Sequence, residues 1–282
     1  MFTIAKILLP IDFSPRSTDA ADAAAAIADH FASEITVLHV LAPRFDLSPT
    51  SAESARADAE QKLQEFRSSE WQSLRVKRAL LEGDPASKIV EYARSEGVDL
   101  IMMPTHGYGP FRRLLLGSIT AKVLHDSSCL VWTAVHTPDA ASCVHAARPH
   151  HIACAVDLGP QTASILSWAS RLSGEFGAKL SVIHVVTSLD PRLQTYYLSP
   201  EWRSEVISEA KADLVKAMET AGTTGEIHIE IGSIADAIAA AARTMQADLL
   251  LIGRSSFDGV TGRLPTNAYA IIRESPCPVL SV

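Results

Sequence analysis

The chain has 282 residues, and at roughly 100–200 residues per domain this length predicts two domains. Its net charge is −7 and no basic stripe stands out, which argues against a general role in binding nucleic acid or an anionic membrane. The sequence has neither an apolar run near the ~18–20 residues that span a bilayer nor a signal peptide, so we expect a cytoplasmic protein.

The first half alternates between short apolar runs and helical segments. Ile7–Ile11 is an uninterrupted apolar run, and Ser14 followed by Pro15 is typical of a helix start. Strands that are apolar throughout and separated by helices predict a parallel sheet covered on both faces. The further strands are expected at 35–40, 75–81, 100–103 and 130–134, and the further helices at 51–66, 85–95 and 119–125.

The second half of the chain repeats the first. The run KILLPIDFSP recurs as HIACAVDLGP, which places Asp12 and Asp157 145 positions apart. The run GVDLIMM recurs as QADLLLI, with Asp99 and Asp248 149 positions apart, and SSCLVW recurs as SPCPVL. Because the matched segments keep their order and nearly constant spacing, each half is predicted to be a complete domain of one fold.

The predicted domains are residues 1–137 and 150–282, joined by a small polar linker at 138–149. The last strand of each half, 130–134 and 279–282, would leave an open sheet edge that seeks a partner. We therefore expect the halves to pair through these strands as an internal pseudo-dimer. Further association of the whole chain into a homodimer stays open.

Ligands of parallel sheets bind beyond the carboxyl ends of the strands. In the first half Asp12 follows the first strand, Val40 ends the second, and the segment MPTHGYGPFRRLLLGSITAKVL follows the fourth. This segment places Gly117 and Ser118 at the start of a helix, where free backbone N–H groups favour phosphate. His106 lies inside the segment, and Arg112 and Arg113 are either phosphate partners or solvated loop residues.

The segment resembles the phosphate-binding signature of the universal stress protein family, in which glycines are separated by two and then nine residues and followed by serine or threonine. The resemblance covers both halves and implies two Rossmann-like domains, each with a five-stranded parallel sheet, and an adenine nucleotide, in the first place ATP, bound by the first. It leaves an accompanying Mg²⁺ open. The implied binding residues are Pro10, Ile11, Asp12, Val40, Met103, Gly107, Gly117, Ser118 and Ile119.

Within this set, the resemblance implies that Asp12 and Val40 contact the adenosine part and that Met103 lines the pocket. The glycines of the loop and Ser118 would hold the phosphates. Pro104 departs from the family pattern, because the first glycine of the signature is expected there. Proline lacks an N–H and carries a ring, so it either removes a donor or narrows the pocket.

The second half has drifted further from the signature. Gly253 keeps the first glycine, Ser256 replaces the second, and Thr266 with Asn267 stands where glycine and serine are expected. Asp157 and Val185 survive on the adenosine side. We therefore expect weak or no ATP binding by this half.

The sequence leaves three functions open: a nucleotide-binding stress or regulatory protein, a scaffold that acts through protein contacts, and a slow ATP hydrolase. Between Met103 and Ser118 there is no carboxylate to position a metal, so we expect no efficient catalysis. His39 and His184 end matching strands and are predicted to be hydrogen-bonded structural residues. Cys129 and Cys277 lie in apolar runs and are predicted to be buried thiols.

Overall fold

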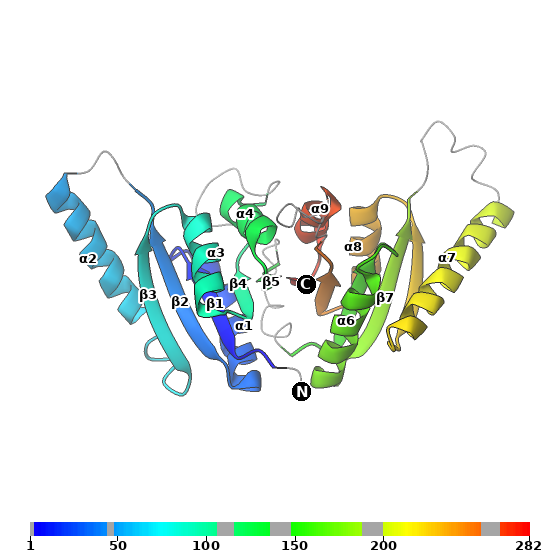
Figure 1. The fold of residues 1–282 in the computed structure, drawn as a ribbon, viewed down its shortest axis with the longest axis horizontal. Coiled ribbons are helices and arrows are strands. Elements are labelled where there is room, and N and C mark those ends of the chain that lie inside the picture. Colours follow the sequence, from blue (N-terminus) through cyan, green and yellow to red (C-terminus); the bar gives the residue numbers. More distant parts are fainter. Residues whose placement is uncertain (1–2, 44–47, 106–115, 136–147, 188–199, 255–265) are drawn as a thin grey trace. The chain divides into compact units, whose positions relative to one another are not determined.

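The computed structural model describes residues 3–43, 48–105, 116–135, 148–187, 200–254 and 266–282. These residues divide into two compact units, one for each half of the chain. In the first unit the described strands form a parallel sheet in the order β3-β2-β1-β4-β5. Its elements are β1 (Lys6–Ile11), α1 (Pro15–Phe31), β2 (Glu34–Leu41), α2 (Pro49–Glu65), β3 (Arg75–Glu82), α3 (Pro85–Glu96), β4 (Leu100–Met103), α4 (Ser118–Asp126) and β5 (Leu130–Thr133) (Figure 1).

The second unit repeats this arrangement, with a parallel sheet in the order β10-β9-β6-β7-β8. Two α/β domains with parallel sheets confirm the predicted fold class, while the pairing of the two halves stays a prediction. The elements of the second unit are β6 (His151–Val156), α6 (Thr162–Phe176), β7 (Lys179–Val186), α7 (Pro200–Thr220), β8 (Glu226–Ile231), α8 (Ile234–Thr244), β9 (Leu249–Ile252), α9 (Thr266–Glu274) and β10 (Val279–Ser281).

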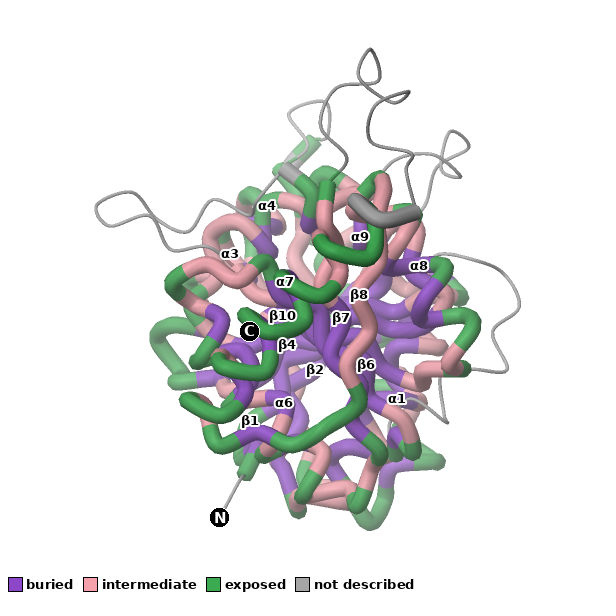
Figure 2. Tube along the Cα trace, turned by 90° about the vertical axis from the view of Figure 1, so that its right-hand side faces the viewer, coloured by how far each residue is buried: buried purple, intermediate pink, exposed green. Residues whose placement is uncertain are grey.

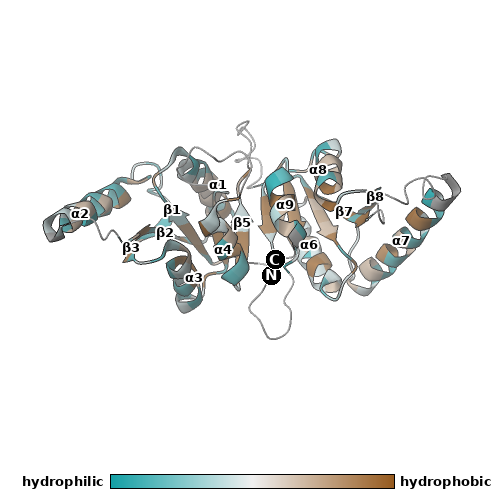
Figure 3. Ribbon diagram, turned by 90° about the horizontal axis from the view of Figure 1, so that it is seen from above, coloured by the Kyte–Doolittle hydropathy of each residue, from teal (hydrophilic) through white to brown (hydrophobic). Residues whose placement is uncertain are grey.

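Helices cover both faces of each sheet. Right-handed crossovers place α1 and α2 on one face of the first sheet and α3 and α4 on the other, and Figure 3 shows α1 opposite α3 and α4. In the second domain α6 and α7 pack together on one face, and α8 packs with α9 on the other. The central strands are buried apart from Lys6 at the start of β1 (Figure 2), as their uninterrupted apolar runs predict.

Capping residues explain where the helices begin. The hydroxyl of Ser14 accepts a hydrogen bond from the Ser17 N–H, and Pro15 occupies the first turn, as predicted. The same Ser-Pro pair, Ser48 and Pro49, begins α2 two residues before the predicted start. This pair is a local helix-start signal of the same kind as Ser14 and Pro15.

Candidate functional site at the carboxyl edge of the first sheet

The sheet of the first domain reverses its strand order at β1. From β1 the chain proceeds to β2 and β3 on one side, and later to β4 and β5 on the other. Ile11 pairs with His39 of β2, and Leu8 pairs with Ile101 of β4. In this register the carboxyl ends of β1, β2 and β4 meet at one edge. Such a switch point is where ligands of open α/β sheets bind.

The structure brings together most of the residues predicted from the sequence. Asp12 and Val40 follow the paired residues Ile11 and His39 and are partly exposed, while Met103 ends the adjacent strand and is buried. Pro10 and Ile11 are buried in β1, so they support the site through the sheet. Gly107, His106, Arg112 and Arg113 lie outside the described residues.

Asp12 is held in a tight turn between β1 and α1. Its Oδ1 accepts hydrogen bonds from the Ser14 N–H at 3.0 Å and from the Ser17 hydroxyl at 2.8 Å. Phe13 adopts a left-handed conformation, with a φ of 61°, that is uncommon for a residue with a side chain. The turn fixes the Asp12 carboxylate at the edge of the sheet, where it is suited to accept a hydrogen bond from a hydroxyl or amino group.

His39 is hydrogen-bonded within the fold, as predicted. Its Nδ1 lies 2.8 Å from the carbonyl oxygen of Ile11, and because a carbonyl only accepts, Nδ1 must carry the proton. The ring also lies against Phe13, with ring centroids 4.5 Å apart. His39 therefore joins the ends of β1 and β2 and stiffens the Asp12 turn.

The N-terminus of α4 is anchored at this edge. The Gly117 N–H donates to the carbonyl of Thr105 at 2.9 Å, and the Thr120 hydroxyl donates to the carbonyl of Pro104 at 3.1 Å. Gly117 is the N-cap residue and makes no side-chain cap. The first N–H groups of a helix have no partner within the helix, so this turn presents donors and the positive end of the dipole. Ser118 and Ile119 are exposed beside them.

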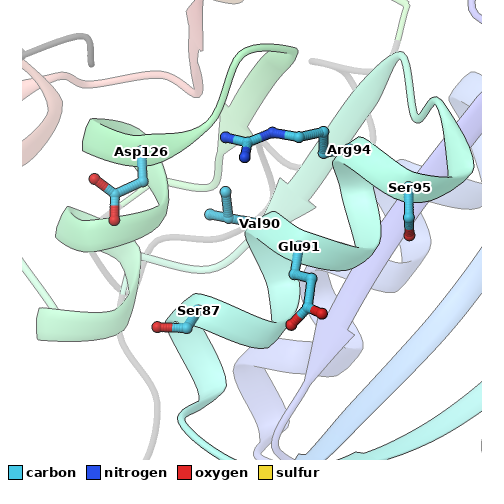
Figure 4. Close-up of a pocket in the computed structure, with 6 residues that line it drawn as sticks. All are labelled: Ser87, Val90, Glu91, Arg94, Ser95 and Asp126. Carbon is cyan, nitrogen blue, oxygen red and sulfur yellow. The ribbon is translucent and has the colours of Figure 1, made fainter. Parts of the chain in front are cut away.

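A groove of about 520 Å³ lies between α3 and α4, away from the switch point. Figure 4 shows the side chain of Arg94 reaching from α3 toward α4 across Val90. The groove does not include Asp12 or the first turn of α4, so it is distinct from the predicted site. Its lining residues are Ser87, Val90, Glu91, Arg94, Ser95 and Asp126.

Comparison with known proteins identifies the family. The model of the universal stress protein family matches residues 3–134 and again residues 149–282. The chain belongs to the universal stress protein family. The universal stress protein MJ0531 of Methanocaldococcus jannaschii is 32% identical over 139 residues, covering 45% of this chain and 79% of that protein. MJ0577 of the same organism is 30% identical over 145 residues, covering 44% and 90%.

A solved structure supports the tandem arrangement of the fold. The crystal structure of a universal stress protein from Archaeoglobus fulgidus matches with a TM-score of 0.69 and 22% identity, covering 99% of this chain and 98% of that one. At this level of identity the match shows the fold alone. None of the helices in the described part of the chain is long and apolar enough to cross a membrane.

The second domain of this universal stress protein keeps the frame of the site. His184 Nδ1 donates to the Val156 carbonyl at 2.9 Å, as His39 does in the first domain. Asp157 follows β6, and its Oδ1 accepts from the Gly159 N–H at 2.8 Å. Leu158 has a φ of 59°, matching Phe13. The strand-end geometry is therefore common to both copies.

The start of the helix after the fourth strand of each domain differs between the two copies. Both α4 and α9 have nine residues, and they begin at Ser118 and Thr266, which are 148 positions apart. Met103 and Ile252, at the ends of the preceding strands, are 149 positions apart. The second loop is thus one residue shorter. Thr266 corresponds to Ser118 rather than to Gly117, which shifts the sequence-based match by one residue.

Sequence reasoning missed a polar link between α3 and α4. The Lys122 ammonium donates to Asp84 Oδ1 at 2.8 Å and to the Ser87 hydroxyl at 2.8 Å. The pKa of Asp84 is lowered, first by the hydrogen bond from Lys122 and then by those from Ser87, and the pKa of Lys122 is raised in turn. These residues are 38 positions apart, so no local pattern could have shown the pairing.

The cysteines differ from one another. Cys277 is buried, as predicted, and burial raises the pKa of its thiol to about 12. Cys154 is also buried, and burial raises its pKa to about 12. Cys129, the counterpart of Cys277, is only partly buried, so the prediction of a core thiol was wrong for this residue.

Proposed function

We propose that the first domain binds an adenine nucleotide, in the first place ATP, and that the protein acts as a nucleotide-binding stress or regulatory protein. The observation that carries this proposal is the α4 N-terminus, which has no side-chain cap from Gly117 and is anchored to the residues that follow β4, the strand next to β1. A phosphate group is suited to such a turn because it accepts hydrogen bonds and carries negative charge.

The nucleoside end has its own support. Asp12 directly follows β1, Val40 lies near the end of the neighbouring strand β2, and both are partly exposed. A carboxylate fixed by two hydrogen bonds can receive a ribose hydroxyl without reorganising. With Gly117 and Ser118 at the other end, the site offers distinct environments for the sugar and the phosphates. Any accompanying Mg²⁺ would be held mainly by the nucleotide.

Titration calorimetry with ATP, ADP and AMP, with and without Mg²⁺, tests the proposal. We expect about one nucleotide per chain, because α9 begins after a shorter loop. Gly117→Val should abolish measurable binding, since its side chain would occupy the position of a phosphate, while circular dichroism and the melting temperature stay close to those of the unchanged protein. No heat with the unchanged chain at millimolar nucleotide would refute the proposal and favour a scaffold.

A further inference from the structure

The second domain keeps the first glycine of the family signature, Gly253. A side chain of α6 packs against this residue. A Cβ added to Gly253 would lie 2.2 Å from Cδ1 of Ile165 and 2.9 Å from its Cγ1. Both distances are too short for carbon atoms in contact. A side chain at this position would force Ile165 to move, so packing against α6 favours glycine here independently of any ligand.

The sequences of α1 and α6 align residue by residue without a gap. Each ends in a left-handed residue, Ala32 in α1 and Gly177 in α6, 145 positions apart. Every buried residue of α6 has a buried counterpart in α1 at the same offset. The matched buried residues of the two helices are Ser17 with Thr162, Ala20 with Ile165, Ala21 with Leu166, Ala24 with Ala169, and Ile27 with Leu172.

The strands can be matched in the same way. Ile7 pairs with Leu100 in the first domain, and Ile152 pairs with Leu249 in the second, so Pro104 is the counterpart of Gly253. By these offsets the counterparts of Gly253 and Ile165 are Pro104 and Ala20, so we expect Pro104 to face Ala20. In this pair the second domain has the larger side chain on the helix, at Ile165, and the first domain has it after the strand, at Pro104. Pro104 and Ala20 are both buried.

A third position changes together with this pair. Thr120, the third residue of α4, is buried and donates its hydroxyl to the Pro104 carbonyl at 3.1 Å. Its counterpart in α9 is Ala268, which has no hydroxyl and is also buried. The first domain therefore ties the residue after β4 to the first turn of α4 by a bond that the second domain cannot form.

We propose that Pro104 and Thr120 are positioning residues of the nucleotide site. The ring of Pro104 fills the space beside Ala20, on the α1 side of the sheet, and leaves the ligand side open. Its fixed φ then holds its carbonyl where Thr120 anchors the first turn of α4. This inference rests on the proposed function, and it explains how the first domain dispenses with the first glycine of the signature.

A stability cycle on the ligand-free chain tests the packing. Ala20→Ile should lower the melting temperature of the first domain by at least about 4 °C, because the new side chain overlaps the proline ring. Adding Pro104→Gly should restore most of this loss, since it recreates the arrangement of Gly253 and Ile165. Ala24→Ile is the matched control: it adds the same side chain to the same buried face, and Pro104→Gly should not rescue it.

ATP titration of Thr120 variants tests the positioning. Thr120→Val keeps the shape and loses the hydroxyl, and it should weaken ATP binding about 10-fold, whereas Thr120→Ser should stay within about twofold of the unchanged chain. Tighter ATP binding by Pro104→Gly, with no rescue of Ala20→Ile, would overturn the inference by placing the ring on the ligand side. Equal affinities for Thr120→Val and the unchanged chain would overturn the role of the hydroxyl.

The two arms separate this inference from the proposed function. If the unchanged chain binds no nucleotide, the proposed function fails and the positioning role fails with it. Rescue of Ala20→Ile by Pro104→Gly would still establish the packing exchange in that case. If the chain binds ATP and the rescue does not occur, the inference alone is refuted.

Discussion

The two domains share the frame of the site and differ where a ligand would be held. In both, a histidine ties the end of the second strand to the first, and a left-handed residue turns the chain after an aspartate. In contrast, the helix after the fourth strand is anchored by Thr120 in the first domain and begins one residue earlier, relative to the strand, in the second. The comparison indicates that the strand-end turn and its histidine persist in both copies, while the start of the helix after the fourth strand differs.

Asp99 and Asp248 offer the strongest way to test the shared frame. Asp99 accepts the N–H groups of Ala5 and Lys6 at 2.8 and 2.9 Å, and Asp248 accepts those of His150 and His151 at 2.7 and 2.9 Å. Each carboxylate therefore fixes the start of the first strand of its domain. Removing either should cost a similar amount, because the geometry is the same.

We expect Asp99→Ala and Asp248→Ala each to lower the stability of its own domain by about 1–2 kcal/mol, since hydrogen bonds to charged groups are worth somewhat more than neutral ones. Denaturant unfolding, monitored in both variants, measures the two losses. The Asn variants serve as controls that keep the acceptor oxygen. A large loss in one domain and none in the other would contradict a common frame.

Lys122 tests a feature of the first domain alone. Its partners Asp84 and Ser87 correspond to Ser233 and Asp236, and Lys122 itself corresponds to Ala270, so the second domain lacks the link. Lys122→Gln should lower the melting temperature of the first domain slightly at neutral pH. The effect is expected to be small because the pair is exposed.

The stabilisation by Lys122 should depend on pH in a definite direction, because Lys122 lowers the pKa of Asp84. A carboxyl group whose pKa is lowered by folding adds stability above its ordinary titration range and loses it as the pH falls. The difference between the unchanged chain and Lys122→Gln should therefore be constant near pH 7 and shrink progressively below about pH 4. Lys88→Gln, which removes a pair with Glu91 on α3, is the control. A difference that grows in acid would refute this assignment.

The smallest expected effect concerns the two matched cysteines. Cys277 is buried and the pKa of its thiol is raised to about 12, so it stays protonated and shielded at neutral pH. Cys129 is only partly buried. Brief alkylation of the native protein, followed by peptide mapping, should label Cys129 and leave Cys277 unmodified. Equal labelling of both would show that the last strand of the second domain opens readily.

The sequence predicted the strands and most helices because their apolar runs and caps are local signals. Ile7–Ile11 matches β1 within one residue, and the cap at Ser14 is as expected. The turn at Asp12 and the hydrogen bond of His39 also follow from local repeats in the two halves. The family signature placed Gly117 and Ser118 at the start of α4, as the structure has them.

Contacts between distant elements were beyond such reasoning. The link from Lys122 to Asp84 depends on how α3 and α4 pack, and neither residue belongs to a motif. Likewise the fit of Gly253 against Ile165 depends on the separation of β9 and α6. Pro104 departs from the family signature, and the hydrogen bond that its carbonyl accepts from Thr120 could not be predicted because it depends on how α4 packs after β4.

The shorter second loop carries a consequence for tracing the history of this chain. Counting forward from Ile252 with the spacing of the first half falls one residue past Thr266, the position that α9 assigns to the Ser118 counterpart. Relatives of the second domain aligned by loop spacing would thus show an apparent replacement where there is a deletion. Ancestral reconstruction should anchor on the helix and on the cysteine that follows it, which keep a single offset through the end of the chain.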